Sequence, residues 1–389
     1  MSTLFTGSQS LIPVSVLTGF LGSGKTTVLN HLARSELMSR ALVIINEFGA
    51  VGLDHDLVAR STEKLVVEVM GGCLCCTIRG DLLATLRDAP WRVSRDGTCW
   101  FDRVVIETTG LAYPAPILHT LMTDERLQTL YRLDGVIATV DAANGNATLD
   151  AQEEAVKQAA VADRILLTKT DLVSDEDRLA LEARLQALNP AAPIIMTTIG
   201  EVDAELLFDA GLYNPETKSD DVRRWLRAEA YEDHGHHHDH GHDHGHDHGH
   251  DHGHDHTHGH HDHDVNCHDS SIYATCLTFD EPLQAHAFER WLDILVAFKG
   301  AAILRVKGIV NIAGEDRPVV IHGVQHVFHP PILLETWPSD DRRTRLVFIT
   351  RNVTPDELQG TLALMTIGLT RFGLQGLVDN VPSTGLLRI

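Results

Sequence analysis

The segment PVSVLTGFLGSGKTTVLN, residues 13–30, determines the fold that we expect for this chain of 389 residues. A short β-branched run leads into a glycine-rich turn, and a helical pattern follows it. The turn GFLGSGKT, residues 19–26, matches the phosphate-loop motif G-x-x-x-x-G-K-[ST] at every position and lies between a strand and a helix, as this motif requires. The segment therefore predicts the first βαβ unit of a mostly parallel sheet.

The phosphate loop predicts how a nucleotide is held. Its glycines let backbone N–H groups surround the phosphate oxygens, and the N-terminus of the following helix attracts the same negative charge. We expect Lys25 to bridge the β- and γ-phosphates and the Thr26 hydroxyl to hold Mg²⁺. The expected nucleotide contacts in this loop are Gly19, Gly22, Ser23, Gly24, Lys25, Thr26 and Thr27.

A carboxylate ends a later strand. The apolar run in RVVIETTG, residues 103–110, stops at Glu107. We expect Glu107 to orient the Mg²⁺ shell or the attacking water, and Gly110 to approach the γ-phosphate. The plain alternative is a solvent-facing glutamate. Lys25 and Glu107 are therefore the predicted catalytic residues.

The segment ILLTKTD, residues 165–171, resembles the guanine-reading N/T-K-x-D element of GTPases, with Thr168 where asparagine is commoner. We expect Asp171 to accept hydrogen bonds from the guanine ring N–H and exocyclic amine, which adenine cannot supply. Lys169 is expected to lie across the base. The prediction is hydrolysis of GTP to GDP and phosphate.

The chain divides into regions of different composition. Alternating strand and helix patterns continue to about Phe208. Residues 234–268 then contain 18 histidines, and from Asp239 to His256 the unit Asp-His-Gly-His repeats with a period of four. No core can be built from histidine, aspartate and glycine, so we expect disorder without metal. The expected regions are an N-terminal tail (1–12), an α/β P-loop GTPase domain (13–230), a histidine-rich linker (231–270) and a small α+β domain (271–389).

The periodicity of apolar residues predicts the individual elements. The expected strands are 13–18, 41–46, 64–70, 103–107, 135–140, 164–168 and 194–197, then 272–279, 303–312, 318–323 and 345–350. The expected helices include 28–37, 175–188, 284–298 and 354–364.

Three cysteines, Cys73, Cys75 and Cys76, lie in the segment GGCLCC, residues 71–76. Thiolates favour Zn²⁺, Cu⁺ and iron–sulfur centres, and the neighbouring glycines let the backbone wrap around a small ion. Three thiolates leave one tetrahedral position open, which suits transient binding. The alternative is a set of buried or redox-active cysteines.

The histidine-rich linker offers many interchangeable imidazole sites, which suit Zn²⁺, Ni²⁺, Cu²⁺ and Co²⁺. We interpret it as a reservoir that raises the metal concentration near the cysteines, and a polar spacer is the alternative. Representative ligands are His236, His238, His240, His242 and His244.

Together these motifs resemble the CobW-type metallochaperone family of P-loop GTPases, in its zinc-handling branch. The matching motifs are GFLGSGKTT (19–27), INEFGAVGLD (45–54), GGCLCC (71–76), ETTG (107–110) and TKTD (168–171), with the histidine-rich linker, RVKG (305–308) and Trp337 after them. The resemblance implies a cargo metal on the cysteines, near the nucleotide. It also implies that Asn46, Glu47 and Asp54 lie in a nucleotide-sensitive switch, where Glu47 assists with Mg²⁺ or cargo unless it is a solvated loop residue.

We therefore predict a GTP-hydrolysing metallochaperone that delivers zinc to client metalloproteins. Two alternatives stay open: a zinc buffer or storage protein, and the same GTPase carrying cobalt for cobalamin synthesis or nitrile hydratase activation. A formal net charge of −22 argues against nucleic-acid and membrane partners, and an oligomer is left open. Clustered thiols without a secretory pattern at the N-terminus favour a reducing cytoplasm.

Overall fold

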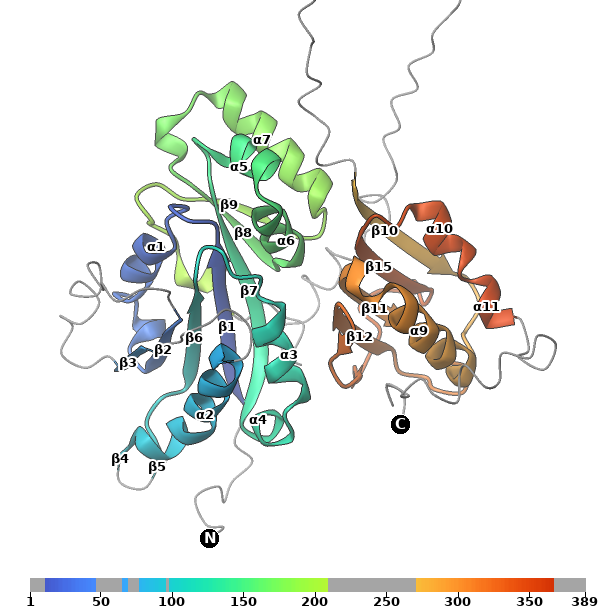
Figure 1. The fold of residues 1–389 in the computed structure, drawn as a ribbon. Helices are drawn as coiled ribbons and strands as arrows, with labels where there is room; N and C mark the ends of the chain where they lie inside the picture. The colour runs from blue at the N-terminus through green and yellow to red at the C-terminus, as the bar shows by residue number, and fades with distance from the viewer. Residues whose placement is uncertain (1–10, 47–64, 69–76, 96–97, 209–270, 367–389) are drawn as a thin grey trace, which may run out of the picture.

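The computed structural model describes residues 11–46, 65–68, 77–95, 98–208 and 271–366. These residues form two main sheets, each covered by helices (Figure 1). The first belongs to an α/β domain with a phosphate loop, and the second to a smaller domain with an antiparallel sheet. The predicted fold class is confirmed.

The first sheet has seven strands among the described residues, in the order β3-β2-β6-β1-β7-β8-β9, and every pairing is parallel. The central strand β1 therefore delivers the phosphate loop between its neighbours β6 and β7. The strands are β1 (Ile12–Gly19), β2 (Ala41–Asn46), β3 (Leu65–Glu68), β6 (Arg103–Thr108), β7 (Tyr131–Asp141), β8 (Arg164–Thr168) and β9 (Ile194–Met196). A small antiparallel hairpin is formed by β4 (Ser94–Arg95) and β5 (Thr98–Cys99).

Helices cover both faces of this sheet because successive side chains of a strand point to opposite faces. On β2, Leu42 and Ile44 join the core beneath α2, α3 and α6, whereas Val43 and Ile45 join the core beneath α1. The helical segments are α1 (Lys25–Leu32), η1 (Glu36–Met38), α2 (Thr77–Arg92), α3 (Ala115–Thr123), α4 (Glu125–Leu130), α5 (Gly145–Ala151), α6 (Glu153–Val161), η3 (Thr170–Leu172), α7 (Asp175–Leu188) and η4 (Ala204–Leu206).

Two predicted boundaries in this domain are wrong. The helix expected at 28–37 begins at Lys25 and ends at Leu32, because the chain must turn back to bury Met38 in the same core. The strand expected at 135–140 begins at Tyr131. Its early part contains Asp134, a buried carboxylate that interrupts the apolar pattern and accepts a hydrogen bond from Ser15 Oγ at 2.8 Å.

The second sheet has six strands among the described residues, all paired antiparallel. One of its faces packs on α9, where Trp291 and Phe348 meet edge to face. The elements are β10 (Ile272–Phe279), α9 (Ala285–Lys299), η7 (Gly300–Ala302), β11 (Ile303–Val310), β12 (Val319–Val324), β13 (Val327–Phe328), β14 (Ile332–Leu333), β15 (Thr344–Arg351), α10 (Pro355–Gly360) and α11 (Ala363–Thr366).

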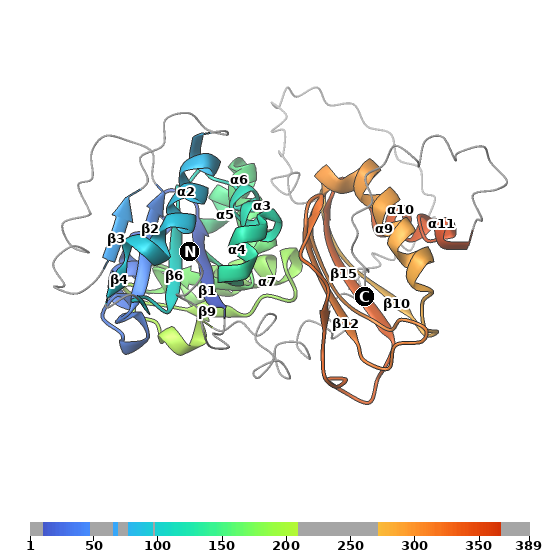
Figure 2. The ribbon, with the colours of Figure 1, turned by 90° about the horizontal axis from the view of Figure 1, so that it is seen from below.

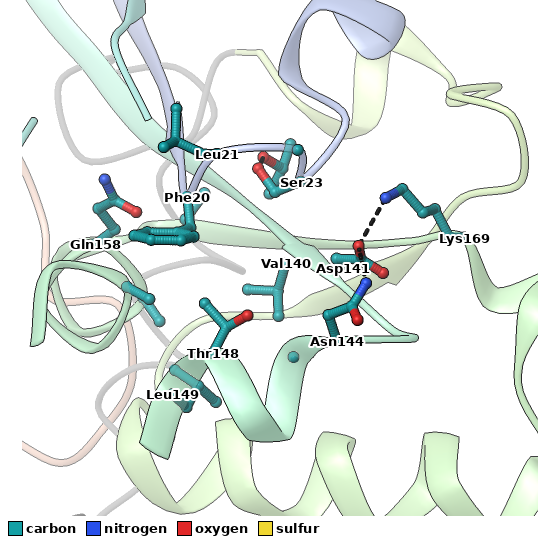
Figure 3. A pocket seen from close by; sticks show the side chains of 16 residues that line it. Phe20, Leu21, Ser23, Val140, Asp141, Asn144, Thr148, Leu149, Gln158 and Lys169 are labelled. Atoms are coloured by element: carbon teal, nitrogen blue, oxygen red, sulfur yellow. Dashed lines mark hydrogen bonds and ion pairs between the residues drawn. The ribbon is translucent and has the colours of Figure 1, made fainter. Parts of the chain in front are cut away.

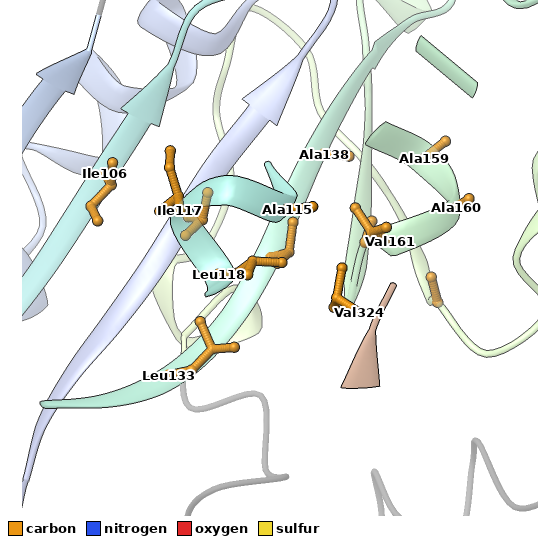
Figure 4. Close-up of a cluster of buried hydrophobic side chains, with 14 of the residues drawn as sticks. Ile106, Ala115, Ile117, Leu118, Leu133, Ala138, Ala159, Ala160, Val161 and Val324 are labelled. Carbon is orange, nitrogen blue, oxygen red and sulfur yellow. The ribbon is translucent and has the colours of Figure 1, made fainter. Parts of the chain in front are cut away.

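The other face of the second sheet packs against the first domain (Figure 2). Val324 of β12 lies beside Val161 of α6 in a cluster that continues into the core of the first domain (Figure 4). The His119 ring on α3 makes a hydrogen bond of 2.9 Å with the carbonyl of Val324. The two domains therefore share one apolar interface. No helix in the described part of the chain is both long and apolar enough to span a bilayer.

Candidate nucleotide-binding site

The phosphate loop connects the end of β1 to the start of α1. Gly24, the N-cap of α1, has φ 93°, a left-handed conformation that glycine adopts without a steric penalty. Lys25 follows it and is buried, with Nζ donating hydrogen bonds to the carbonyls of Gly19 at 2.9 Å and Phe20 at 3.1 Å. The loop thus bends around the Lys25 ammonium.

A cavity of about 290 Å³ opens at this loop. On its wall, the Thr26 hydroxyl donates a hydrogen bond of 2.9 Å to Oε1 of Glu107, although the two residues are 81 positions apart. A hydroxyl and a carboxylate are the hard oxygen donors that Mg²⁺ prefers, so these two residues suit that ion. The predicted site residues that line the cavity are Gly22, Gly24, Lys25, Thr26, Thr27, Glu107, Gly110 and Lys169.

The ETTG segment after β6 touches the phosphate loop. A side chain at Gly110 would place its Cβ 2.6 Å from the backbone nitrogen of Leu21, so this close approach requires glycine. From the other side, the buried amide of Gln158 on α6 donates hydrogen bonds to the carbonyls of Gly110 at 3.1 Å and Ala112 at 2.8 Å. Gln158 therefore holds the loop that approaches the phosphate site.

The TKTD segment begins at the end of β8. Thr168 is buried, and its hydroxyl donates a hydrogen bond of 2.8 Å to the carbonyl of Ser23. This bond attaches the predicted guanine-reading segment to the phosphate loop, a role that a hydroxyl fills here in place of an asparagine amide. Asp171 is exposed beyond it.

Sequence reasoning missed Asp141, which ends β7 beside Thr168 of β8. Its carboxylate accepts hydrogen bonds from Lys169 Nζ at 2.6 Å, Asn144 Nδ2 at 3.0 Å and the Ala143 N–H at 2.8 Å. Burial acts to raise the pKa of Asp141, but the bonds from Lys169 and Asn144 outweigh it and lower the pKa. The sequence feature that could have identified Asp141 is a carboxylate directly after a predicted buried strand, since that strand neighbours the TKTD strand in a parallel sheet.

Ile199 was also missed. It lies in the turn after β9 with φ 53° and a side chain that is 74% exposed, although β-branched residues rarely adopt positive φ. The following residue, Gly200, approaches the carbonyl of Thr27 at the start of α1, so this turn borders both α1 and the TKTD segment. The sequence feature that could have identified this turn is the glycine that follows the last parallel strand after a short connection.

A second cavity of about 370 Å³ lies beside the phosphate loop (Figure 3). Phe20, Val140 and Leu149 form its apolar part, and the paired Asp141 and Lys169 lie at its other end. Gly19 and Ser23 lie on this side of the loop, where the hydroxyls of Ser23 and Thr139 are 2.6 Å apart.

Apart from Thr26, the predicted metal ligands lie outside the described residues. They are Glu47, the cysteines Cys73, Cys75 and Cys76, and the tract represented by His236, His238, His240, His242 and His244. In the described part of the chain, no group of three or more histidine, cysteine, aspartate or glutamate residues is arranged to hold a metal ion.

Two family models match the chain, one after the other. The model of the CobW/HypB/UreG nucleotide-binding domain matches residues 13–196, and that of the cobalamin synthesis protein cobW C-terminal domain matches residues 272–365.

Individual relatives match over nearly their whole length. The chain is 30% identical to zinc chaperone YjiA of Escherichia coli over 353 residues, which cover 90% of this chain and 98% of the relative. It is 30% identical to zinc chaperone CobW of Pseudomonas aeruginosa over 370 residues, 87% of each chain. The crystal structure of zinc-bound YjiA GTPase from E. coli matches with a TM-score of 0.64 and 27% identity, over 91% of this chain and 99% of that one.

Proposed function

Because the chain belongs to the CobW/HypB/UreG family of P-loop GTPases, we propose that it is a metallochaperone that binds zinc at Cys73, Cys75 and Cys76 and delivers it to client metalloproteins. Two relatives that match most of the chain are named zinc chaperones, which favours zinc over cobalt. The cysteines supply three thiolates for a tetrahedral ion, with one position open for transfer.

The contact between Thr26 and Glu107 is the observation that carries the nucleotide part of the proposal. Thr26 and Glu107 would hold Mg²⁺ there, and the ion would supply neutralisation of the phosphate charge. Lys25 moves its ammonium from the loop carbonyls to the same phosphates, and Glu107 holds the Mg²⁺ shell. Asp171 reads the guanine base from its exposed position.

The topology of the sheet supports a cargo site close to the nucleotide. Ile45 of β2 is aligned with Glu107 on one side and with Glu68 of β3 on the other. Glu68 therefore lies two strand spacings, about 10 Å, from Glu107. The eight residues 69–76, which include the three cysteines, connect this edge of the sheet to the start of α2 at Thr77.

We further propose that nucleotide and cargo are coupled through residues 46–54, which follow β2. Asn46 is aligned with Thr108, so this segment leaves the sheet beside the ETTG loop. GTP and Mg²⁺ order the segment and raise metal affinity, and hydrolysis releases it. Reciprocity then requires the cargo metal to tighten GTP binding by the same factor.

The histidine-rich linker acts in this proposal as a reservoir that feeds the cysteine site. The histidines at 234–268 form many weak sites, whereas the cysteines form one tighter site. A chain in which the linker holds most of the metal would be a buffer instead.

The test is a competition titration with a calibrated chelator, in which zinc and cobalt affinities are measured with GTP–Mg²⁺, with GDP and without nucleotide. The same titration is run on a variant with Cys73, Cys75 and Cys76 changed to alanine, and on one lacking residues 234–268.

A nucleotide-gated chaperone predicts tight zinc binding that requires GTP, disappears with the cysteines and survives loss of the linker. Equal zinc affinity in all three nucleotide states would refute the coupling. Binding that is lost with the linker alone would identify a buffer, and tighter cobalt than zinc binding would change the cargo.

A further inference from the structure

Asp141 is held rigidly at the edge of the nucleotide site. Its side chain is 11% exposed, and its two oxygens accept three hydrogen bonds, from Lys169, Asn144 and the Ala143 N–H. Two of these donors come from the turn directly after β7, so the carboxylate keeps its place whether or not Lys169 is bound to it.

Lys169 is fixed at both of its ends. Its backbone has φ 56°, which is uncommon for a residue with a side chain, and its ammonium lies 2.6 Å from Oδ2 of Asp141. A free lysine stem samples many rotamers, and ordering it opposes binding. Here the ion pair with Asp141 orders the stem before a ligand arrives.

The stem of Lys169 lies between two cavities. It lines both the 290 Å³ cavity, which contains Thr26 and Glu107, and the 370 Å³ cavity, which contains Asp141 (Figure 3). Without Asp141 to hold the ammonium at one end of the stem, the flexible lysine could turn it toward the triphosphate. Lys169 would then attract the phosphates of any nucleotide, and its stem would no longer lie beneath a base.

We propose that Asp141 is a positioning residue for guanine recognition, which anchors the Lys169 ammonium away from the phosphates and presents the lysine stem as a flat apolar surface for the base. This inference rests on the proposed roles of Lys169 and Asp171 in binding guanine. Asp141 itself does not touch the nucleotide. It sets base selectivity through Lys169 and has no part in phosphate chemistry.

The test compares Asp141→Asn with the unaltered chain in three measurements: affinity for fluorescent GDP, competition by ATP, and steady-state GTP hydrolysis. Loss of one charged hydrogen bond predicts about tenfold weaker GDP binding and a similar rise in KM, with kcat within about twofold. The preference for guanine over adenine nucleotides should fall in the same variant. Asp141→Glu, which keeps the charge, recovers part of the affinity.

Asp150→Asn is the matched control, because Asp150 on α5 pairs with Arg184 at 2.7 Å and touches neither cavity. It should leave KM, kcat and base preference unchanged. Melting temperatures of all variants separate loss of folding from loss of binding.

A double-mutant cycle with Lys169→Met identifies the path of the effect. If Asp141 acts through Lys169, Asp141→Asn changes GDP affinity no further in the Lys169→Met background. An equal loss in both backgrounds, or unchanged affinity in Asp141→Asn alone, would overturn the inference. Asp171→Asn is run in parallel: if it leaves the guanine preference intact, the guanine site itself is misassigned, and if it abolishes the preference while Asp141→Asn does nothing, only the role of Asp141 fails.

Discussion

Among the described residues of the first domain, two that carry side chains hold a left-handed backbone conformation, and both follow neighbouring strands at the edge that carries the phosphate loop. Lys169 follows β8 with φ 56°, and Ile199 follows β9 with φ 53°. Such strained residues cluster at functional sites, where the surrounding structure maintains them for binding. Lys169 lies two residues before Asp171, and Gly200, which follows Ile199, approaches the carbonyl of Thr27, so both strained residues border the proposed base-binding end of the site.

Ile199→Gly separates stability from binding. Removing the side chain relieves a left-handed penalty of about 1–2 kcal/mol, and the extra freedom of unfolded glycine cancels part of it, so the free energy of unfolding should rise by up to about 1 kcal/mol. Nucleotide affinity should fall, because glycine loosens the turn that borders α1 and the TKTD segment. Urea unfolding and fluorescent-GDP titration measure the two effects.

Gln325→Gly provides the comparison. Gln325 has φ 55° in the turn between β12 and β13, so the same relief of strain is expected there. It lies in the second domain and should leave GDP affinity unchanged. If Ile199→Gly also left affinity unchanged, the turn would have no role in binding.

At the scale of single elements, α6 connects the nucleotide site to the second domain. Gln158, in the middle of the helix, holds the ETTG loop through two carbonyls. The end of the helix meets β11, where Arg305 donates a hydrogen bond to the carbonyl of Val161. The ETTG loop and the second domain are therefore both attached to α6, the first at the middle of the helix and the second at its C-terminal end.

Gln158→Leu tests this attachment. Leucine has a similar size but cannot donate, so the buried carbonyl of Gly110 and the partly buried carbonyl of Ala112 lose their partner, and the free energy of unfolding should fall by about 2 kcal/mol. GTP hydrolysis should slow as well, since the ETTG loop loses its support. Both are measured on the purified variant, by urea unfolding and phosphate release.

Gln186→Leu on α7 is its control. Gln186 is exposed and bonds only the nearby carbonyl of Pro190, so the change should cost less than about 0.5 kcal/mol. A loss for Gln158→Leu no larger than this would mean that water replaces the two hydrogen bonds and that α6 does not support the loop.

Sequence patterns predicted elements well where the signals were local. The helix at 175–188 was predicted to its exact ends because Ser174 caps it by accepting a hydrogen bond from the N–H of Asp177. The phosphate loop and its Lys25 and Thr26 were recognisable for the same reason. Local patterns could not reveal contacts between distant segments, such as Thr168 with Ser23 or Asp163 with Arg305, which are 145 and 142 positions apart.

At the scale of the whole molecule, a cluster of charges is buried where the two domains meet. Asp163, just after α6, accepts hydrogen bonds from Arg305 and from Lys307 Nζ, the latter at 2.5 Å, and from the N–H of Val136 at 2.8 Å. Burial acts to raise the pKa of Asp163, but the charges of Arg305 and Lys307 outweigh it and hold the pKa well below its usual range. Asp163 is therefore ionised at neutral pH despite its burial.

His322 makes the stability of this interface depend on pH. Burial lowers its pKa from 6.5 to about 4, the charge of Asp163 opposes that shift, and His329 adds to it. Between pH 6.5 and 4, His322 binds a proton in the unfolded chain but not in the folded chain. The contribution of His322 to the free energy of unfolding is therefore fully present above this window and is lost as the pH falls through it. The loss should reach about 2 kcal/mol at pH 5.

Urea unfolding at pH 7.5 and pH 5 measures this loss, in a variant that lacks residues 234–268 so that the histidine tract does not contribute. His322→Gln should reduce the difference in the free energy of unfolding between pH 7.5 and pH 5, whatever its effect on stability at pH 7.5. His329, whose pKa is also lowered by burial, should contribute to the pH dependence that remains. An unchanged slope in His322→Gln would show that His322 is protonated in the folded chain.

Among the described residues, the carboxylates of Asp163 and Glu153 form ion pairs across the domain interface, and their different burial predicts a large loss of stability for removing the first and a small loss for removing the second. Asp163→Asn removes the carboxylate charge that pairs with both Arg305 and Lys307 at this buried site, which should cost about 3–5 kcal/mol. Glu153→Gln breaks the pair with Arg351, whose side chains are 44% and 35% exposed, and should cost less than about 1 kcal/mol.

Urea unfolding followed in both domains distinguishes these outcomes. Because the domains share one apolar cluster, the unaltered chain should unfold in a single transition, whereas Asp163→Asn should weaken docking enough to split it into two. The Glu153→Gln variant should keep the single transition. Equal small losses for both variants would mean that apolar packing around Val324, and not the buried charges, holds the second domain against the GTPase domain.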